Sequence, residues 1–219
     1  MNELDKSRLL FLPVFAAGLA AAFLLHATIA SAAEPVKSQD PPQFLANMPA
    51  GLYKTDNNHT HLYFTYSHVG FSRSHGRFDR FSGELQFDPK NPESSAVTFT
   101  IDPTSIDMNV SDLDAQLKGV HFFDVANIHE IKFVGHGFLR SSGTEGSLIG
   151  DLTMHGVTHP VTLAVRLNKF LVSATPKFTR FGFTATGTIK RSEWGLGNVP
   201  LVGDDVALDF DVEFTKAVT

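Results

Sequence analysis

The sequence predicts an all-β domain built as an antiparallel barrel or sandwich. Apolar and polar residues alternate in Val97–Ile101, Phe181–Ile189 and Val206–Phe214, so each segment reads as a strand with one apolar face. About eight such strands are expected, separated by turn residues, with one clear helix among them. The pattern alone does not separate a barrel from a sandwich, nor a filled interior from a hollow one.

The first 32 residues are expected to form a signal peptide. Lys6 and Arg8 precede an apolar run at 9–29, and small residues at 30–32 offer a cleavage site. The alternative is an uncleaved anchor, because the run is long enough to span a bilayer.

A Pro-rich tether is expected at 33–50, with one helical turn that docks on a barrel domain at 51–219. The chain has no Cys and 20 Phe, so a hydrophobic core must supply the stability that disulfides give other exported proteins. Its net charge of −5 lacks the Lys/Arg excess that a phosphate backbone demands. Nucleic acid is therefore not an expected partner.

The expected strands are 60–70, 76–88, 96–101, 130–135, 146–154, 161–167, 181–190 and 206–215. Pro89–Pro92, Ser141–Gly143 and Gly203-Asp204 carry turn signals between them. Gly83 interrupts an apolar face, which indicates a bend or a close neighbour.

The clear helix is expected after residue 110. Ser111 can cap it, Leu113 and Leu117 lie one turn apart, and Gly119 can end it. Because a helix that interrupts a barrel often covers an opening, we expect this helix and Phe122-Phe123 to act as a lid.

Several segments together resemble the YceI-like family, over roughly residues 51–216. The matching segments are Thr65-x-x-His68-x-Gly70, Gly76-Arg77-Phe78-x-x-Phe81-x-Gly83, Phe122-Phe123-Asp124-Val125, Ile131-Lys132-Phe133, Gly150–Val161, Arg191-Ser192-Glu193-Trp194-Gly195 and Val202–Val206. Gln116 departs from the pattern, since members typically carry His at this position. The departure bears on which head group this chain prefers.

The resemblance implies an eight-stranded, lipocalin-like antiparallel β-barrel with one or two short helices, located in the periplasm. Its interior is implied to bind a long polyisoprenoid, of the quinone or polyprenyl phosphate type, for carriage, storage or sensing. The resemblance implies no enzyme activity, and no cofactor is expected beyond the bound lipid. It leaves open an encounter with a membrane surface for lipid exchange, and a homodimer.

The expected ligand-binding residues are apolar strand residues, with two polar residues near one end. The apolar set is Leu62, Phe64, Phe81, Leu85, Phe99, Phe133, Leu152, Leu163, Phe183 and Phe210. The polar pair is His68 and Arg191. For Arg191, a salt bridge with Asp151 or Glu193 is the favoured interpretation, and a ligand phosphate is the alternative.

Two other classes of function are weighed against lipid binding. One is a secreted, stress-related structural or interaction protein with a solid core. The other is a metal-dependent hydrolase, for which His59 with His61, or His155 with His159, offer half of a metal site. His68 with Asp151, Arg191 or Glu193 is the candidate acid–base set, but no nucleophile motif accompanies it. No metal site and no catalytic residue is therefore assigned.

Overall fold

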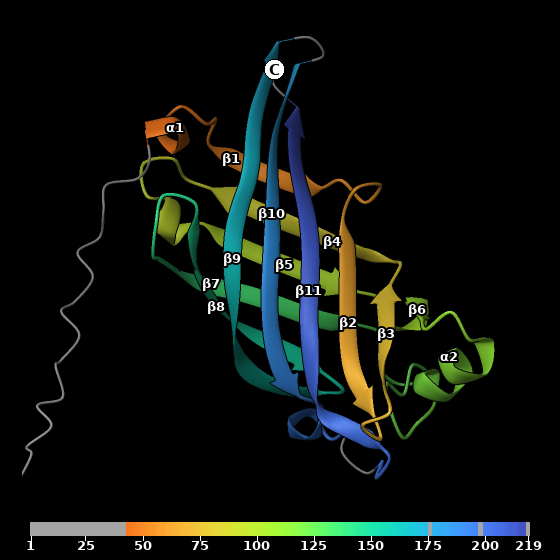
Figure 1. Ribbon diagram of the computed structural model, residues 1–219. Helices are drawn as coiled ribbons and strands as arrows, with labels where there is room; N and C mark the ends of the chain where they lie inside the picture. The colour runs from red at the N-terminus through yellow and green to blue at the C-terminus, as the bar shows by residue number, and fades with distance from the viewer. Residues whose placement is uncertain (1–42, 175–176, 197–198, 218–219) are drawn as a thin grey trace, which may run out of the picture. The chain divides into compact units, whose positions relative to one another are not determined.

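The computed structural model describes residues 43–174, 177–196 and 199–217, in which eleven strands form one continuous sheet (Figure 1). The strands are β1 (Gly51–Thr55), β2 (His61–His68), β3 (Ser72–Phe78), β4 (Phe81–Phe87), β5 (Ala96–Ile101), β6 (Ile106–Asp107), β7 (Ile131–Arg140), β8 (Glu145–Met154), β9 (Val157–Ala174), β10 (Lys177–Lys190) and β11 (Val202–Ala217). The helices are α1 (Gln43–Ala46) and α2 (Ser111–Lys118), and the short 3₁₀ turns are η1 (Pro92–Ser94), η2 (Pro103–Ser105) and η3 (Arg191–Trp194). No helix in these ranges is long and apolar enough to cross a membrane. The expected signal peptide lies outside the described residues.

Eight of the strands close into an antiparallel barrel in the order β1-β4-β5-β7-β8-β9-β10-β11, with β1 pairing back to β11. Lys54 of β1 lies opposite Glu84 of β4 on one side and Thr215 of β11 on the other, so this five-residue strand completes the ring. The predicted eight-stranded barrel is confirmed. Its membership differs from the expectation, because β1 was not among the expected strands and β2 lies outside the ring.

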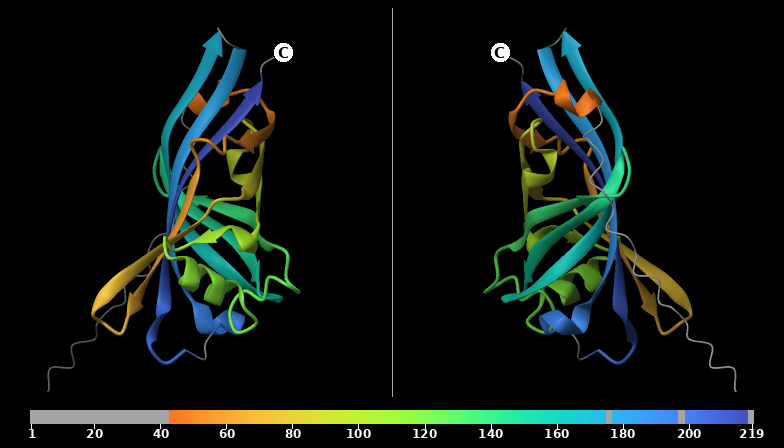
Figure 2. Two further views of the ribbon diagram at one scale, coloured as in Figure 1. Left: turned by 90° about the vertical axis from the view of Figure 1, so that its right-hand side faces the viewer. Right: turned by 90° about the vertical axis from the view of Figure 1, so that its left-hand side faces the viewer.

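The strands β2, β3 and β6 extend the sheet beyond the barrel. β2 pairs with the 202–211 part of β11, whereas β1 pairs with the neighbouring 214–215 part. β3 pairs with β2, and the two-residue β6 pairs with β3. The β2–β3 hairpin therefore projects from the barrel wall, as the side views show (Figure 2).

The single strand expected at 76–88 is wrong, since the structure divides it into β3 and β4. The break falls at Asp79 and Arg80, whose backbone groups bond to the η2 turn. The Asp79 N–H donates to the Ser105 carbonyl at 3.2 Å, and the Asp102 N–H donates to the Arg80 carbonyl at 3.0 Å. The turn thus takes the backbone hydrogen bonds that a continuous strand would give to its neighbour.

The turn expected at Gly203-Asp204 is also wrong. Both residues belong to β11, at a register irregularity between Val202 and Val206. The Gly203 carbonyl accepts from Arg191 Nε at 3.0 Å, and the Asp204 carboxylate accepts from the Ser192 N–H at 2.9 Å. These bonds hold the segment extended against η3.

The helix expected after residue 110 is present as α2, but Ser111 does not cap it. Val110 occupies the cap position, and no side chain bonds to the first turn there. The Asp114 carboxylate instead accepts from the Met108 N–H at 2.7 Å, which ties the helix to the segment before it. Gly119 follows the last helical residue, as expected.

The prediction of a close neighbour at Gly83 is confirmed. A Cβ atom built there would lie 2.5 Å from Cγ2 of Thr55 and 2.7 Å from Cε1 of Phe99. Before β1, α1 supplies Leu45, which packs against the core, and Met48 is 2% exposed. The residues before β1 therefore contribute to the barrel interior.

Candidate functional site

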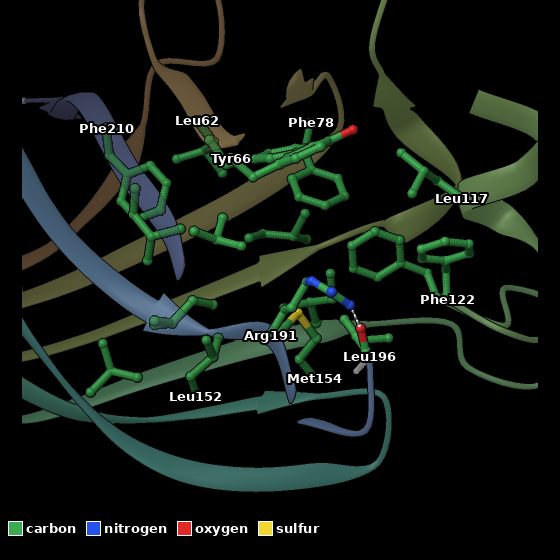
Figure 3. A pocket seen from close by; sticks show the side chains of 18 of the residues that line it. Leu62, Tyr66, Phe78, Leu117, Phe122, Leu152, Met154, Arg191, Leu196 and Phe210 are labelled. Atoms are coloured by element: carbon green, nitrogen blue, oxygen red, sulfur yellow. Dashed lines mark hydrogen bonds between the residues drawn. The ribbon is translucent and has the colours of Figure 1, made fainter. Parts of the chain in front are cut away.

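The barrel encloses a cavity of about 560 Å³, which we call the main cavity. Its wall is almost entirely aliphatic and aromatic (Figure 3). Its residues come from β2, β3, β5, β7 to β11, α2, η3 and the segments that follow α2 and η3. Buried aliphatic side chains from neighbouring strands form the floor, among them Leu152, Val161, Leu163 and Ile189. A volume of this size falls in the range of small-molecule sites.

Nine of the twelve expected ligand-binding residues line the main cavity: Leu62, Phe64, His68, Phe99, Phe133, Leu152, Leu163, Arg191 and Phe210. Period-2 alternation put the strand residues among them on one face of each strand. Closure of the ring turned that face inward for the residues of β5, β7 to β9 and β11, whereas Leu62, Phe64 and His68 reach the cavity from β2, outside the ring, and Arg191 from η3. That they contact a ligand stays a prediction.

The other three expected residues lie elsewhere. Leu85 and Phe183 line a second cavity of about 160 Å³. Phe81 lines neither cavity, because it is the first residue of β4, beside the break after β3, and its half-buried ring packs against the core.

The second cavity adjoins the main one. Phe99, Leu148, Ala185 and Val212 line both, so the two spaces meet at these four side chains, which we call the junction. Beyond the junction the second cavity reaches Leu45 of the α1 turn. The interior is therefore elongated rather than a single chamber.

Arg140 borders the second cavity at its far end. Its side chain is 8% exposed and pairs with Glu93 of η1 at 3.1 Å. Buried Arg residues are rare without a carboxylate partner, and Glu93 is that partner for Arg140 at the edge of the second cavity.

Arg191 is buried at the wall of the main cavity, and the favoured salt bridge with Asp151 or Glu193 is wrong. Its guanidinium instead donates to backbone carbonyls of the loop that leads into β11. Nε bonds the Gly203 carbonyl at 3.0 Å, and Nη2 bonds the Val202 carbonyl at 2.8 Å.

Two further carbonyls complete this set: Nη2 bonds that of Val199 at 3.1 Å, and Nη1 bonds that of Leu196 (Figure 3). Four of the five guanidinium N–H donors are therefore used in hydrogen bonds to backbone carbonyls. The main structural role of Arg191 is therefore to hold the segment between η3 and β11, which forms one end of the main cavity.

Polar side chains gather at the same end of the main cavity as α2. They are Tyr66 and His68 of β2, Ser74 of β3 and Gln116 of α2. Together they can offer both donors and acceptors to a polar group while the rest of the wall stays apolar. Only His68 was expected among them. Tyr66 shares the parity of Phe64 and His68, so the strand pattern already carried the signal that would have found it.

The segment expected to act as a lid contributes to the cavity wall. Leu113, Leu117, Phe122 and Phe123 all line the main cavity, and Phe123 packs edge-on against Phe78 of β3, with ring centroids 5.7 Å apart. α2 and the loop after it therefore cover this end of the barrel. Opening of that cover stays a prediction.

The histidine pairs considered for metal binding have structural partners instead. His155 Nδ1 lies 3.1 Å from the Trp194 carbonyl, and His159 Nε2 lies 3.0 Å from the Glu193 carbonyl. Both rings therefore clamp η3 against the β8–β9 turn. His61 stacks on Tyr63 and is not part of a cluster of potential metal ligands among the described residues.

His59 does belong to such a cluster, with Asp56 and Glu213, whose potential ligand atoms lie within 4.8 Å of one another. Arg180 already occupies both carboxylates, with Nη2 2.9 Å from Asp56 and Nη1 2.5 Å from Glu213. Partial burial acts to raise the pKa of Asp56, but hydrogen bonds from His59 and the Asn58 N–H and the nearby positive charge lower it overall. The carboxylate is thus stabilised as an ion-pair partner.

The candidate acid–base set is not assembled. Asp151 lies on the outer face, 3.5 Å from His136, whereas Arg191 is inside and committed to carbonyls. His68 lies at the cavity end, and Glu193 contributes its backbone carbonyl to His159.

The chain is similar to known proteins over most of its length. The family model of the YceI-like domain matches residues 53–214. Protein YceI of Escherichia coli O157:H7 is 34% identical over 151 residues, which cover 67% of this chain and 77% of that protein. A UPF0312 protein of Vibrio vulnificus is 28% identical over 171 residues, 77% of this chain and 87% of its own length.

Solved structures share the fold. BcnA of Burkholderia cenocepacia superposes with a TM-score of 0.65 at 22% identity, covering 73% of this chain and 98% of its own. A polyisoprenoid binding domain from Saccharophagus degradans, implicated in plant cell wall breakdown, superposes with a TM-score of 0.59 at 16% identity, covering 78% of this chain and all of its own.

Proposed function

Since this chain belongs to the YceI-like family, we propose that it binds a polyisoprenoid lipid inside its barrel. The observation that carries the proposal is the elongated apolar interior, a main cavity of about 560 Å³ next to a second of about 160 Å³ that shares four lining residues with it. The polyisoprenoid binding domain that shares the fold supports the same ligand class. The cavity argues against the solid-core alternative, in which side chains would meet across the barrel.

The energetics favour a long hydrocarbon tail. Burial of one CH₂ group contributes about 0.8 kcal/mol, so a five-carbon isoprene unit contributes roughly 3–4 kcal/mol at most. A few units then suffice to hold the lipid without any polar contact. Affinity should therefore rise with the number of isoprene units until the tail fills the interior.

The arrangement of polar residues gives the ligand a direction. The head group lies at the α2 end, near Tyr66, His68 and Gln116, and the tail runs past the junction toward Leu45. A quinone ring and a polyprenyl phosphate can both accept hydrogen bonds from these groups. The resemblance to the family leads us to expect His at position 116, so in this chain a neutral amide of Gln116 meets the head group instead.

The role that fits this site is carriage, storage or sensing of the lipid in the periplasm, after cleavage of a signal peptide at 1–32. A protein that hides an isoprenoid from water must meet a membrane surface to load and release it. We include that encounter in the proposal and assign no catalytic step.

Extraction of the purified protein with organic solvent, followed by mass spectrometry, tests the proposal directly. The expected result is an isoprenoid in stoichiometric amount. The delipidated protein should then bind fluorescent prenyl probes of one to eight units with affinity that rises steeply with length. Equal, weak binding at all lengths, together with repeated absence of lipid in the extract, would refute it.

A further inference from the structure

The tip of the β2–β3 hairpin exposes apolar side chains to solvent. Phe71 is 88% exposed and Val69 45% exposed, in the turn that joins the two strands. Leu201, 59% exposed, lies beside them, and its carbonyl accepts from the Val69 N–H at 3.1 Å. We call these three residues the tip patch. An exposed Phe at the end of a projecting hairpin is not explained by packing.

The backbone conformation at the tip is unusual for the residue that occupies it. Val69 has a φ of 54° and Gly70 a φ of 75°, which are left-handed values, in the three-residue turn 69–71 between the paired residues His68 and Ser72. Asn, Asp or Gly adopts such values readily, whereas a β-branched residue is strained there. Val at this position lowers the stability of the turn but places an apolar side chain at the tip. Strain of this kind concentrates at functional positions.

The charge of the hairpin differs from that of the whole chain. No Asp or Glu occurs from residue 57 to residue 78, although the chain carries a net charge of −5. Arg73 lies two residues after Phe71 and forms no ion pair among the described residues, whereas Arg77 is held by Asp79 and Asp107 at 2.8 and 2.7 Å. The tip therefore combines apolar side chains with an unpaired cation, which complements an anionic lipid surface.

The tip patch is continuous with the mouth of the main cavity. His68, the last residue of β2, and Leu201 both line that cavity. Across the mouth, α2 is flanked by Val110 and Val120, which are 55% and 64% exposed. The side views place the hairpin, the η3–β11 loop and α2 at the same end of the barrel (Figure 2).

We propose that the tip patch docks this protein onto an anionic bilayer, with Phe71 and Val69 in the interface and Arg73 at the lipid phosphates. Docking brings the cavity mouth to the membrane, so that an isoprenoid tail can pass between the bilayer and the barrel without crossing water. The purpose of docking rests on the proposed function, whereas the docking itself does not. The two are therefore separable by experiment.

Tryptophan reporters test the docking. Phe71→Trp places a reporter at the tip, and Leu139→Trp places a matched one at a site that is 63% exposed beside the β7–β8 turn. Trp194, 1% exposed, gives a common background. With vesicles of phosphatidylethanolamine and phosphatidylglycerol that carry brominated acyl chains, roughly half of the position-71 emission should be quenched, and that of position 139 should not change.

Binding to the same vesicles without bromine measures the contributions of the patch. Phe71→Ser should weaken binding about tenfold, and Leu139→Ser should leave it unchanged. Arg73→Gln should weaken binding about fivefold on these vesicles and have no effect on phosphatidylcholine alone. Any contribution from residues 1–32 is common to all variants and cancels in the comparison.

The outcomes separate the hypotheses. Equal quenching at both positions, or no loss in Phe71→Ser, overturns the docking proposal. A wild-type dimer in sedimentation that Phe71→Ser dissociates also overturns it, because a second copy then covers the patch. Failure of prenyl probes to bind the delipidated protein in buffer, with docking intact, refutes the proposed function and not the docking.

Discussion

The two ends of the barrel interior are built from similar residues but differ in how tightly they pack. The β1 end, which we call the filled end, leaves only the second cavity of about 160 Å³, whereas the α2 end, which we call the hollow end, leaves the main cavity of about 560 Å³. At the β1 end, the rings of Tyr53, Phe87 and Phe181 pack edge to face, with centroids 5.0 Å apart for Tyr53–Phe181 and for Phe87–Phe181. At the α2 end, similar apolar walls surround the main cavity. Hydrophobic composition alone therefore does not decide whether a barrel holds a core or a guest.

The difference can be followed along β10. Its inward positions change from the large Phe181 and Phe183 at the filled end to Ala185 and Gly187 farther along, before Ile189 at the wall of the main cavity. The side chain of Leu163 fills the space beside Gly187. A Cβ atom built on Gly187 would lie 2.7 Å from Cδ2 of Leu163. Ala185 has no such compensation and lines both cavities.

The arrangement of strands also differs between the two ends. At the filled end, β1 connects β4 to β11 and completes the ring. At the hollow end, the edge of β11 pairs with β2, which leads out into the extension, and α2 covers the space (Figure 1).

The largest expected effect is on folding at the filled end. Phe181→Ala removes a ring that is 1% exposed and should lower the free energy of unfolding by about 3–5 kcal/mol. Phe210→Ala, at the wall of the main cavity, should cost roughly 1–2 kcal/mol, since that ring is only partly buried. Urea unfolding of delipidated protein, followed by Trp194 fluorescence, measures both. Equal losses would mean that the hollow end is packed like a core.

A second prediction concerns the junction. Ala185→Phe places a ring between the two cavities and should block the passage of a long tail. Probes long enough to pass the junction should then bind about a hundredfold more weakly, because one buried isoprene unit contributes roughly 3–4 kcal/mol at most. Short probes should bind as before. Ala164→Phe, the same change at an exposed position of β9, is the control. If long and short probes lose affinity alike, the second cavity does not hold the tail.

The smallest expected effect is a pH dependence at the hollow end. The N–H and the hydroxyl of Ser192 lower the pKa of Asp204 below its ordinary value. A carboxyl group with a lowered pKa stabilises the fold above its unfolded value of about 3.9, and this contribution is lost as the pH falls through the folded value.

Asp204→Asn should therefore flatten the acid side of the stability curve by less than about 1 kcal/mol, because the group lies near solvent. Asp209→Asn, at an exposed position in the same strand, is the comparison. Unfolding midpoints measured from pH 7 down to about pH 2 test it. A variant curve parallel to that of the wild type would show that the Ser192 contact does not stabilise the loop.

Many residues in the wall of the main cavity were predictable from the alternation of apolar and polar residues along each strand. Alternation in the β5, β10 and β11 segments identified inward positions such as Phe99 and Phe210, because side-chain direction in a strand depends only on parity. The β1 strand escaped prediction, since five residues give too short a pattern. The break at Asp79 and Arg80 escaped as well, because it depends on hydrogen bonds to η2, more than twenty residues away.

By itself, the sequence determined that strands with one apolar face would form the domain, and it carried the family motifs in order. Only the tertiary structure decided which strands close the ring, that Arg191 binds carbonyls rather than carboxylates, and that Leu85 and Phe183 face a second cavity. The physical reason is the range of the interactions. Parity and turn preference act between neighbours in the chain, whereas ring closure, cavity volume and the partners of a buried cation depend on segments brought together from far apart.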